Sequence, residues 1–217
     1  MVKKSKTDAD SSALLNLLRA IATRDFRKAS KLLAAEPGLA RAAISQGATR
    51  QTARAYYFEK IAHYISAGDT ALHIAAAAYA LPLAHALLTT GANVRAQNRH
   101  GAQPLHYAVD GSPNFETWNP RAQTAVIACL LAAGANPNAR DKRGVTPLHR
   151  AVRNRCAAAV KVLLEHGAGP KLKNGSGSTP TNLARMTTGR GGSGSKAAKM
   201  EQRKIIQLLA KHGARSK

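Results

Sequence analysis

The sequence is poor in acidic side chains, in aromatic side chains and in cysteine. Only 11 of its 217 residues are Asp or Glu, against 33 Lys and Arg, so the formal net charge at pH 7 is +22. A surface this positive favours acidic or polyanionic partners, although net charge says nothing about the fold. Aromatic residues make up 4% of the chain, so a core has to be built from Ala, Leu, Ile and Val. Hydrophobic residues make up 44% of the chain, which is sufficient for a buried core and excludes a wholly disordered chain.

Disulfide frameworks and long apolar runs are missing as well. Cys129 and Cys156 are too few for a disulfide framework, which favours a reducing compartment. The first residues lack the continuous apolar stretch of a secretory signal. The most apolar segment, Thr70–Leu88, contains two His and one Pro, which makes it an unsuitable membrane span. We therefore expect a cytoplasmic protein that does not bind or cross a membrane.

Three segments of the chain align on one another, and this repeat organises the sequence. GDTALHIA, GAQPLHYA and GVTPLHRA begin at Gly68, Gly101 and Gly144, so the copies start 33 and then 43 residues apart. Each copy is followed by a Leu-Leu pair and then by Gly-Ala. A degenerate fourth copy, GSTPTNLA, begins at Gly177.

The residues of the motif suit a pair of short helices. Thr146 can cap a helix N-terminus with its hydroxyl, and Pro147 suits the first helical position, where no N–H donor is needed. Leu148 and the later Leu pair fall on one apolar face, and Gly167 suits the left-handed conformation that ends a second helix. One such pair cannot bury its own apolar face, so the copies are expected to stack as a solenoid.

This pattern resembles the ankyrin repeat, whose signature T-P-L-H-x-A is present unaltered as Thr146–Ala151. The resemblance covers Gly68 to about Ala214, and the insertions in two repeats are similar to those of some bacterial-type ankyrin repeat proteins. It implies a mainly α fold, an ankyrin-repeat α-solenoid of helix-turn-helix units with β-hairpin fingers. By this likeness the fingers lie at Asn93–Gly101, Asn136–Gly144 and Gly169–Gly177.

Upstream of the repeats, two further segments are expected. Residues 1–12 are predicted to be a disordered basic tail. Residues 13–67 are predicted to form an N-terminal helical capping repeat with an extended linker. In that repeat we expect helices at Ala13–Ala22 and Asp25–Ala35, and a further helix at Ala53–Ile65 with Tyr56, Tyr57, Ile61 and Tyr64 on one side.

The repeats themselves are expected at 68–100, 101–143 and 144–176, with a degenerate C-terminal repeat at 177–217. Insertions between the two helices of a repeat are expected at 111–121 in the second repeat and at 187–199 in the last. Both are predicted to lie on one edge of the solenoid, where they flank a basic cleft whose floor is formed by Arg153 and Arg155. Loops longer than a connection requires are often functional.

Each insertion has a structural and a functional interpretation. Phe115 and Trp118 either contribute to a site or cover the apolar edge of the neighbouring repeat. The second insertion has the spacing of a dinucleotide fingerprint, but a predicted helix precedes it where a strand is needed. It is either a flexible linker or an anion site formed by backbone N–H groups. An anion or insertion site would comprise Trp118, Arg155, Arg190, Ser193, Ser195 and Lys196.

No group of side chains indicates catalysis or metal binding. His73, His106 and His149 occupy the His position of the signature, where the resemblance implies structural hydrogen bonds between loops. Cys129 is expected on the buried side of a second helix. Cys156, at an Arg-flanked turn, is a candidate for a lowered pKa but lacks a positioned base. We predict no enzymatic activity, no metal and no cofactor.

The positive charge is concentrated in the last third of the chain, since residues 144–217 carry +13. In ankyrin proteins the partner usually contacts the finger tips and the exposed side of the first helices. The resemblance places there Gln97, Arg99, His100, Arg140, Lys142, Arg143, Arg153 and Lys173. We therefore predict a monomeric, non-catalytic protein-binding scaffold whose basic concave surface binds an acidic or phosphorylated partner. The alternative is sequence-nonspecific binding of nucleic acid or another polyanion through the same surface, although few aromatic side chains are available to stack on bases.

Overall fold

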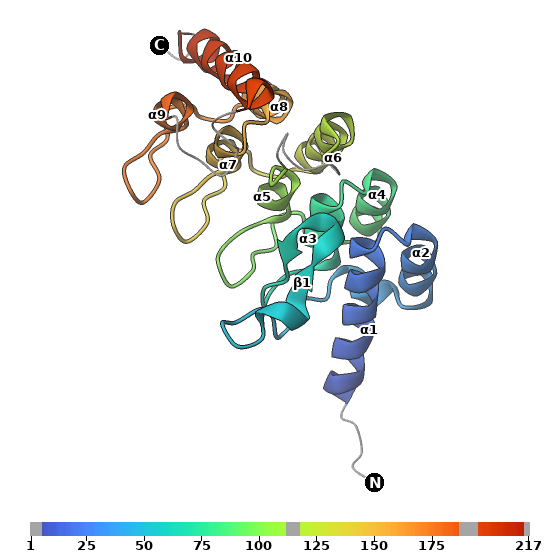
Figure 1. The fold of residues 1–217 in the computed structure, drawn as a ribbon. Helices are drawn as coiled ribbons and strands as arrows, with labels where there is room; N and C mark the ends of the chain where they lie inside the picture. Colours follow the sequence, from blue (N-terminus) through green and yellow to red (C-terminus); the bar gives the residue numbers. More distant parts are fainter. Residues whose placement is uncertain (1–5, 112–117, 187–194, 215–217) are drawn as a thin grey trace.

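Stacked pairs of helices make up the structure. The computed structural model describes residues 6–111, 118–186 and 195–214. Within these ranges the chain forms ten α-helices and one two-stranded sheet. Figure 1 shows the helix pairs following one another along a single axis, with loops that project from one edge of the stack. The predicted mainly α solenoid is confirmed.

The helices form two layers. The inner layer contains α1 (Lys6–Ala22), α3 (Ala71–Ala77), α5 (Pro104–Ala108), α7 (Pro147–Arg153) and α9 (Pro180–Arg185), each packed on the next. The outer layer contains α2 (Phe26–Ala35), α4 (Leu81–Thr89), α6 (Pro120–Ala132), α8 (Ala157–Glu165) and α10 (Lys196–Ala214). From α4 to α10, neighbouring outer helices also pack on one another. Each repeat therefore contributes one helix to each layer.

The signature residues start the inner helices as expected. The Thr146 hydroxyl accepts a hydrogen bond from the backbone N–H of His149, and the Nδ1 of His149 accepts one from the backbone N–H of Thr146 at 3.2 Å. Because Nδ1 is an acceptor, the proton lies on Nε2, which donates to the carbonyl of Ser178 in the next repeat at 3.0 Å. His73 and His106 make equivalent bonds to Ala102 and Val145, each at 3.1 Å. Each signature His thus ties one repeat to the next.

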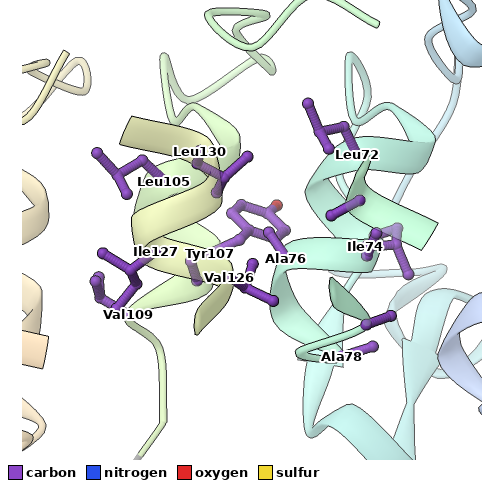
Figure 2. Close-up of a cluster of buried hydrophobic side chains, with 14 of the residues drawn as sticks. Leu72, Ile74, Ala76, Ala78, Leu105, Tyr107, Val109, Val126, Ile127 and Leu130 are labelled. Carbon is purple, nitrogen blue, oxygen red and sulfur yellow. The ribbon is translucent and has the colours of Figure 1, made fainter. Parts of the chain in front are cut away.

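A continuous core runs between the two layers, from α1 to α10. Figure 2 shows Tyr107 of α5 near the centre of this core, among labelled side chains of α3 such as Ile74 and of α6 such as Val126. The larger core side chains are mostly Leu, Ile and Val, and fully buried Ala residues such as Ala75 allow neighbouring helices to approach closely. The core thus has the composition that the scarcity of aromatic residues predicts.

The N-terminal part differs from the sequence prediction at its start. The disordered tail predicted over residues 1–12 overlaps α1, which begins at Lys6, and residues 1–5 lie outside the described ranges. Helix α2 begins after Asp25, whose carboxylate accepts a hydrogen bond from the backbone N–H of Lys28 at 3.0 Å. A 3-10 turn, η1 (Pro37–Ala40), follows α2.

The helix predicted at Ala53–Ile65 is wrong. The segment forms a hairpin of β1 (Tyr57–Phe58) and β2 (His63–Tyr64), with the 3-10 turns η2 (Ala53–Tyr56) before it and η3 (Glu59–Ile61) within it. Tyr57 lies opposite Tyr64 with their ring centroids 4.7 Å apart, and both are exposed. Helical spacing would place these two tyrosines on the same side as Tyr56, but in the structure Tyr56 packs against the core.

The hairpin lies against the inner layer. The ring centroid of His63 is 4.1 Å from that of Tyr107 in α5. At the turn of the hairpin, the ammonium group of Lys60 donates to the carbonyl of Thr23, between α1 and α2, at 3.2 Å. Contacts with residues far away in the sequence therefore decide the conformation of this segment.

Candidate functional site

Three finger loops, at residues 93–101, 136–144 and 169–177, project beside the inner helices (Figure 1). They are small hairpin-like turns in which no residue is assigned to a strand. One side-chain oxygen holds each turn: Asn98 Oδ1 accepts from the N–H groups of His100 and Ala102 at 2.9 and 3.1 Å. Asp141 and Asn174 make the equivalent pairs of bonds, at 2.9 to 3.0 Å. The sequence analysis missed these three residues, although an Asn or Asp stands three positions before each finger glycine.

Backbone hydrogen bonds join successive fingers. The N–H of Lys142 donates to the carbonyl of His100 at 2.9 Å, and the N–H of Gly175 donates to the carbonyl of Arg143 at 2.8 Å. Gly144 has a left-handed φ of +69°, and a Cβ atom there would lie 2.9 Å from the Gly175 nitrogen. These bonds fix the spacing of the finger tips before a partner arrives.

All the predicted partner-binding residues are exposed: Gln97, Arg99, His100, Arg140, Lys142, Arg143, Arg153 and Lys173. Among the described residues, none of the six cations in this set takes part in an ion pair. We call these residues the finger surface. Its cations face solvent without compensation by a neighbouring carboxylate.

The carboxylates near the finger surface turn inward instead. Asp69 is fully buried and accepts hydrogen bonds from the backbone N–H of Ser66, from Tyr107 and from Asn98, at 2.7 to 2.9 Å. Asp110 and Asp141 both bind the guanidinium of Arg150, at 2.6 and 3.3 Å. Burial by itself lowers the pKa of Arg150, but the carboxylates of Asp110 and Asp141 raise it by more, so the net pKa is raised. Arg150 is not among the residues predicted from the sequence, and its position inside the signature is the only sequence feature that distinguishes it.

Two members of the finger surface are less available to an acidic group than the sequence suggests. The guanidinium of Arg99 donates to the carbonyl of Ala48 and, at 3.0 Å, to Nε2 of His100. Desolvation and the positive charge of Arg99 lower the pKa of His100 below its usual value of 6.5, so this imidazole is neutral at pH 7. The free cations of the surface are therefore those of the later fingers and of α7.

Comparison with known protein families agrees with this architecture. The model described as "Ankyrin repeat" matches residues 67–99 and 100–142, and the model described as "Ankyrin repeats (many copies)" matches residues 130–184. The chain belongs to the ankyrin repeat family. Ankyrin repeats generally mediate protein–protein interactions, and proteins built from them are typically not enzymes. No curated protein matches the sequence.

The ankyrin signature histidines have structural roles. Burial lowers the pKa of His73 and His149, and it lowers the pKa of His106 to about 4. Both ring nitrogens of each are engaged in the hydrogen bonds described above. The described ranges contain no cluster of three or more His, Cys, Asp or Glu side chains suited to a metal ion. None of their helices is both long enough and apolar enough to span a bilayer.

Arg153 and Arg155 border a common cavity, but it is less basic than the predicted cleft. Arg155 is only 5% exposed, and its guanidinium donates to the carbonyl of Met186 at 3.4 Å. Desolvation lowers its pKa. A cavity of about 250 Å³ does lie beside both arginines, but its remaining lining is mostly apolar, including Leu183 and Ile205. Arg155 therefore adds little exposed charge to this cavity. The insertions expected to flank the cleft lie mostly outside the described ranges, so the two-sided cleft stays a prediction.

The insertion residues are only partly within the described ranges. Arg190, Ser193 and Phe115 lie outside them. Ser195 caps α10, since its hydroxyl accepts a hydrogen bond from the backbone N–H of Ala198 at 3.1 Å, and Lys196 is exposed. Trp118 packs against the core, and its indole N–H donates to Gln123 Oε1 at 3.0 Å. Trp118 and Arg155 line different cavities.

Neither cysteine has the environment predicted for it. Cys156 is fully buried, its thiol donates to the carbonyl of Gly111 at 2.7 Å, and burial raises its pKa. The expected lowering of its pKa is therefore wrong, because desolvation dominates and the nearby carboxylates of Glu201 and Asp110 also raise the pKa. Cys129 is half-buried rather than buried, and it lines an apolar groove between α4 and α6.

Proposed function

We propose that this ankyrin repeat protein is a non-catalytic, monomeric binding scaffold of the cytoplasm, and that its finger surface binds an acidic or phosphorylated segment of another protein. The proposal rests on the unequal fate of charges near that surface. The carboxylates of Asp69, Asp110 and Asp141 are used by internal hydrogen bonds and ion pairs. The cations of the finger surface are exposed and form no ion pair with a described residue. An acidic partner would supply the negative charges that the neighbouring carboxylates of the chain do not provide to these cations.

The C-terminal half of the finger surface is more accessible to an acidic partner than the N-terminal half. Towards the N-terminus, the β1–β2 hairpin already lies against α5 through His63 and Tyr107. Arg140, Arg143 and Lys173 come from the two later fingers and are exposed. We therefore place the centre of the partner footprint on these fingers.

The chemistry of these side chains suits carboxylates and phosphates. A guanidinium group presents a planar fork of N–H donors that can bind either anion with two parallel hydrogen bonds. The bonds between fingers hold the backbone of Arg143 and its neighbours in place. Little backbone ordering is then needed on binding, which favours affinity.

The test compares a finger variant with a matched control. Arg143→Glu combined with Lys173→Glu reverses two exposed finger charges, and Arg27→Glu combined with Lys31→Glu reverses two exposed charges on α2. Both variants and the wild type serve as baits in pull-downs from source lysate at physiological salt, with and without nuclease. We expect discrete proteins that survive nuclease and are lost only with the finger variant. Equal recovery by the two variants would refute the finger surface as the binding site.

Binding of nucleic acid is the second candidate, and the continuation of exposed cations along α10 favours it. Lys199, Arg203 and Lys204 are exposed on this helix, in the part of the chain that carries +13. Phosphate neutralisation predicts a linear fall of log affinity with log salt, with a slope close to the number of contacts. Material that disappears from the pull-down after nuclease treatment, with such a salt dependence for a DNA duplex, would favour this function over the first.

A further inference from the structure

The outer layer contains a second hollow, away from the fingers. It lies where α10 packs against α8, and Trp118, just before α6, also lines it. Its volume is about 660 Å³, within the range of about 300–1,000 Å³ that is common for ligand pockets. We call it the Trp118 groove. Its floor includes Trp118, Pro120, Ala158 and Leu208.

The floor of the groove is rigid and apolar. The hydrogen-bonding capacity of the Trp118 indole is used by Gln123, which is itself fully buried and donates to the carbonyl of Ala108 at 3.1 Å. This buried chain of hydrogen bonds fixes the orientation of the ring. Part of the ring packs on the core, and the rest lines the groove beside Leu208. The ring therefore offers an apolar contact surface that is already in position.

The rim of the groove is positive. Lys161, Lys204 and Lys211 line it, and Glu201 is the one carboxylate that the described residues contribute. Glu201 is already satisfied, because it accepts hydrogen bonds from the backbone N–H of Ala157 at the start of α8, at 3.0 Å, and from Lys204, at 2.8 Å.

Among the described residues, the other two lysines of the rim have at most a long, exposed ion pair. Lys161 is 3.9 Å from Glu165, and both side chains are about half exposed. Lys211 has no ion pair with a described residue. An occupant has to offer carboxylates to these lysines and an apolar side chain to the floor.

We propose that the Trp118 groove docks an acidic peptide segment of a partner protein, with one large apolar side chain against Trp118 and Leu208 and with flanking carboxylates on Lys161, Lys204 and Lys211. A basic or uncharged apolar segment fits less well, because it brings the lysines under cover without a counter-charge. A purely anionic ligand leaves the apolar floor in water. The site lies on the outer helices, so it does not rest on the function proposed for the finger surface.

The chain contains a single tryptophan, which makes the test direct because the emission of Trp118 reports on the groove. The probe is an octapeptide with three glutamates on each side of a Leu-Phe pair, which has no tryptophan of its own. Two control peptides replace the glutamates by lysines or the Leu-Phe pair by two further glutamates. We expect a saturable change in Trp118 emission, with a micromolar Kd, for the first peptide only.

Two charge variants separate this groove from the finger surface. Lys161→Glu combined with Lys211→Glu is expected to raise the Kd of the acidic peptide at least tenfold. Lys171→Glu combined with Lys173→Glu, at an exposed finger, is expected to leave the Kd unchanged. Circular dichroism and the urea midpoint of each variant establish that it is folded.

Several outcomes would overturn the proposal. The groove is not an acidic-peptide site if Trp118 emission shows no saturable change, or if the lysine peptide or the all-glutamate peptide binds as well as the first. The same holds if the two double variants weaken binding equally, or if single-stranded oligothymidylate changes the emission at lower concentration than the peptide. If the finger surface proves not to bind a partner but the acidic peptide still binds at Trp118, only the proposed function fails. If the finger surface binds its partner but the peptide does not bind at Trp118, only the groove proposal fails.

Discussion

Replacing Gln103 by Thr is expected to stabilise the protein. The other inner helices from α3 to α9 start after a threonine, namely Thr70, Thr146 and Thr179, whereas α5 starts after Gln103. Gln103 is only 7% exposed, and its buried Oε1 atom takes the capping position toward the backbone N–H of His106 without making a hydrogen bond of normal geometry. An unsatisfied buried acceptor costs about 1–3 kcal/mol, and a threonine cap contributes about 1 kcal/mol.

The substitution also removes buried side-chain volume, which costs about 0.8 kcal/mol per methylene group. The net gain in the free energy of unfolding is therefore about 1–2 kcal/mol, from the hydrogen-bond contributions less that loss. For a chain of this size, each kcal/mol corresponds to a rise of about 2–4 °C in Tm.

The measurement is urea unfolding followed by far-ultraviolet circular dichroism, with thermal unfolding beside it. Thr146→Gln is the matched control, because it places glutamine in a repeat whose threonine makes the cap. It is expected to lose about 1–2 kcal/mol. Both variants need unchanged m-values, since repeat proteins can lose their two-state behaviour. A Gln103→Thr midpoint at or below that of the wild type, with Thr146→Gln destabilised, would show that the glutamine is not a defect.

Two further predictions concern acid stability and backbone strain. The pKa of His106 is about 4 in the folded protein and near 6.5 when unfolded, so the unfolded chain binds more protons between these values. Stability is therefore retained above pH 6.5 and falls as pH drops toward 4, by about 3 kcal/mol for this histidine; urea midpoints that stay flat over this window would contradict the assignment. Arg24 is exposed with a φ of +61°, so Arg24→Gly is expected to stabilise the protein by about 0.5–1 kcal/mol. Gly134→Ala, where φ is +91° and the added methyl group meets nothing within 4 Å, should lose about 1 kcal/mol; shifts of the same sign for both variants would refute the strain argument.

The sequence predicts the helix pairs well because their signals are local. A threonine, a proline and a histidine within four residues specify the start of α7, and the hydrogen bonds that they predict are present. The segment 53–65 has no such local code. Its tyrosines have a spacing that fits a helix, but the hairpin is stabilised by the contact of His63 with Tyr107, 44 residues further along the chain. Local spacing cannot report a contact of that kind.

The exposure of the candidate site residues follows from repeat equivalence, but their charge balance does not. Alignment on the signature places Arg143 and Lys173 on fingers, and both are exposed. It gives no sign that Arg150 is bound by Asp110, 40 residues away, or that Arg155 turns inward. Whether an arginine is a free surface cation depends on which carboxylate or carbonyl the stacked neighbour brings to it, and stacking is a tertiary property.

Equivalent positions in successive repeats show where the scaffold has diverged. Counted from the signature His, the same position holds Ala77 in α3, Asp110 after α5 and Arg153 in α7. Ala77 is half-buried, Asp110 is paired with Arg150, and Arg153 is exposed without an ion pair to a described residue. In each repeat this position lies at the end of the inner helix or just beyond it. From α3 to α7, the residue at this position changes from an apolar side chain to a paired charge and then to a charge without an ion pair to a described residue. This change follows the increase in basic residues toward the C-terminus, which is where we place the partner.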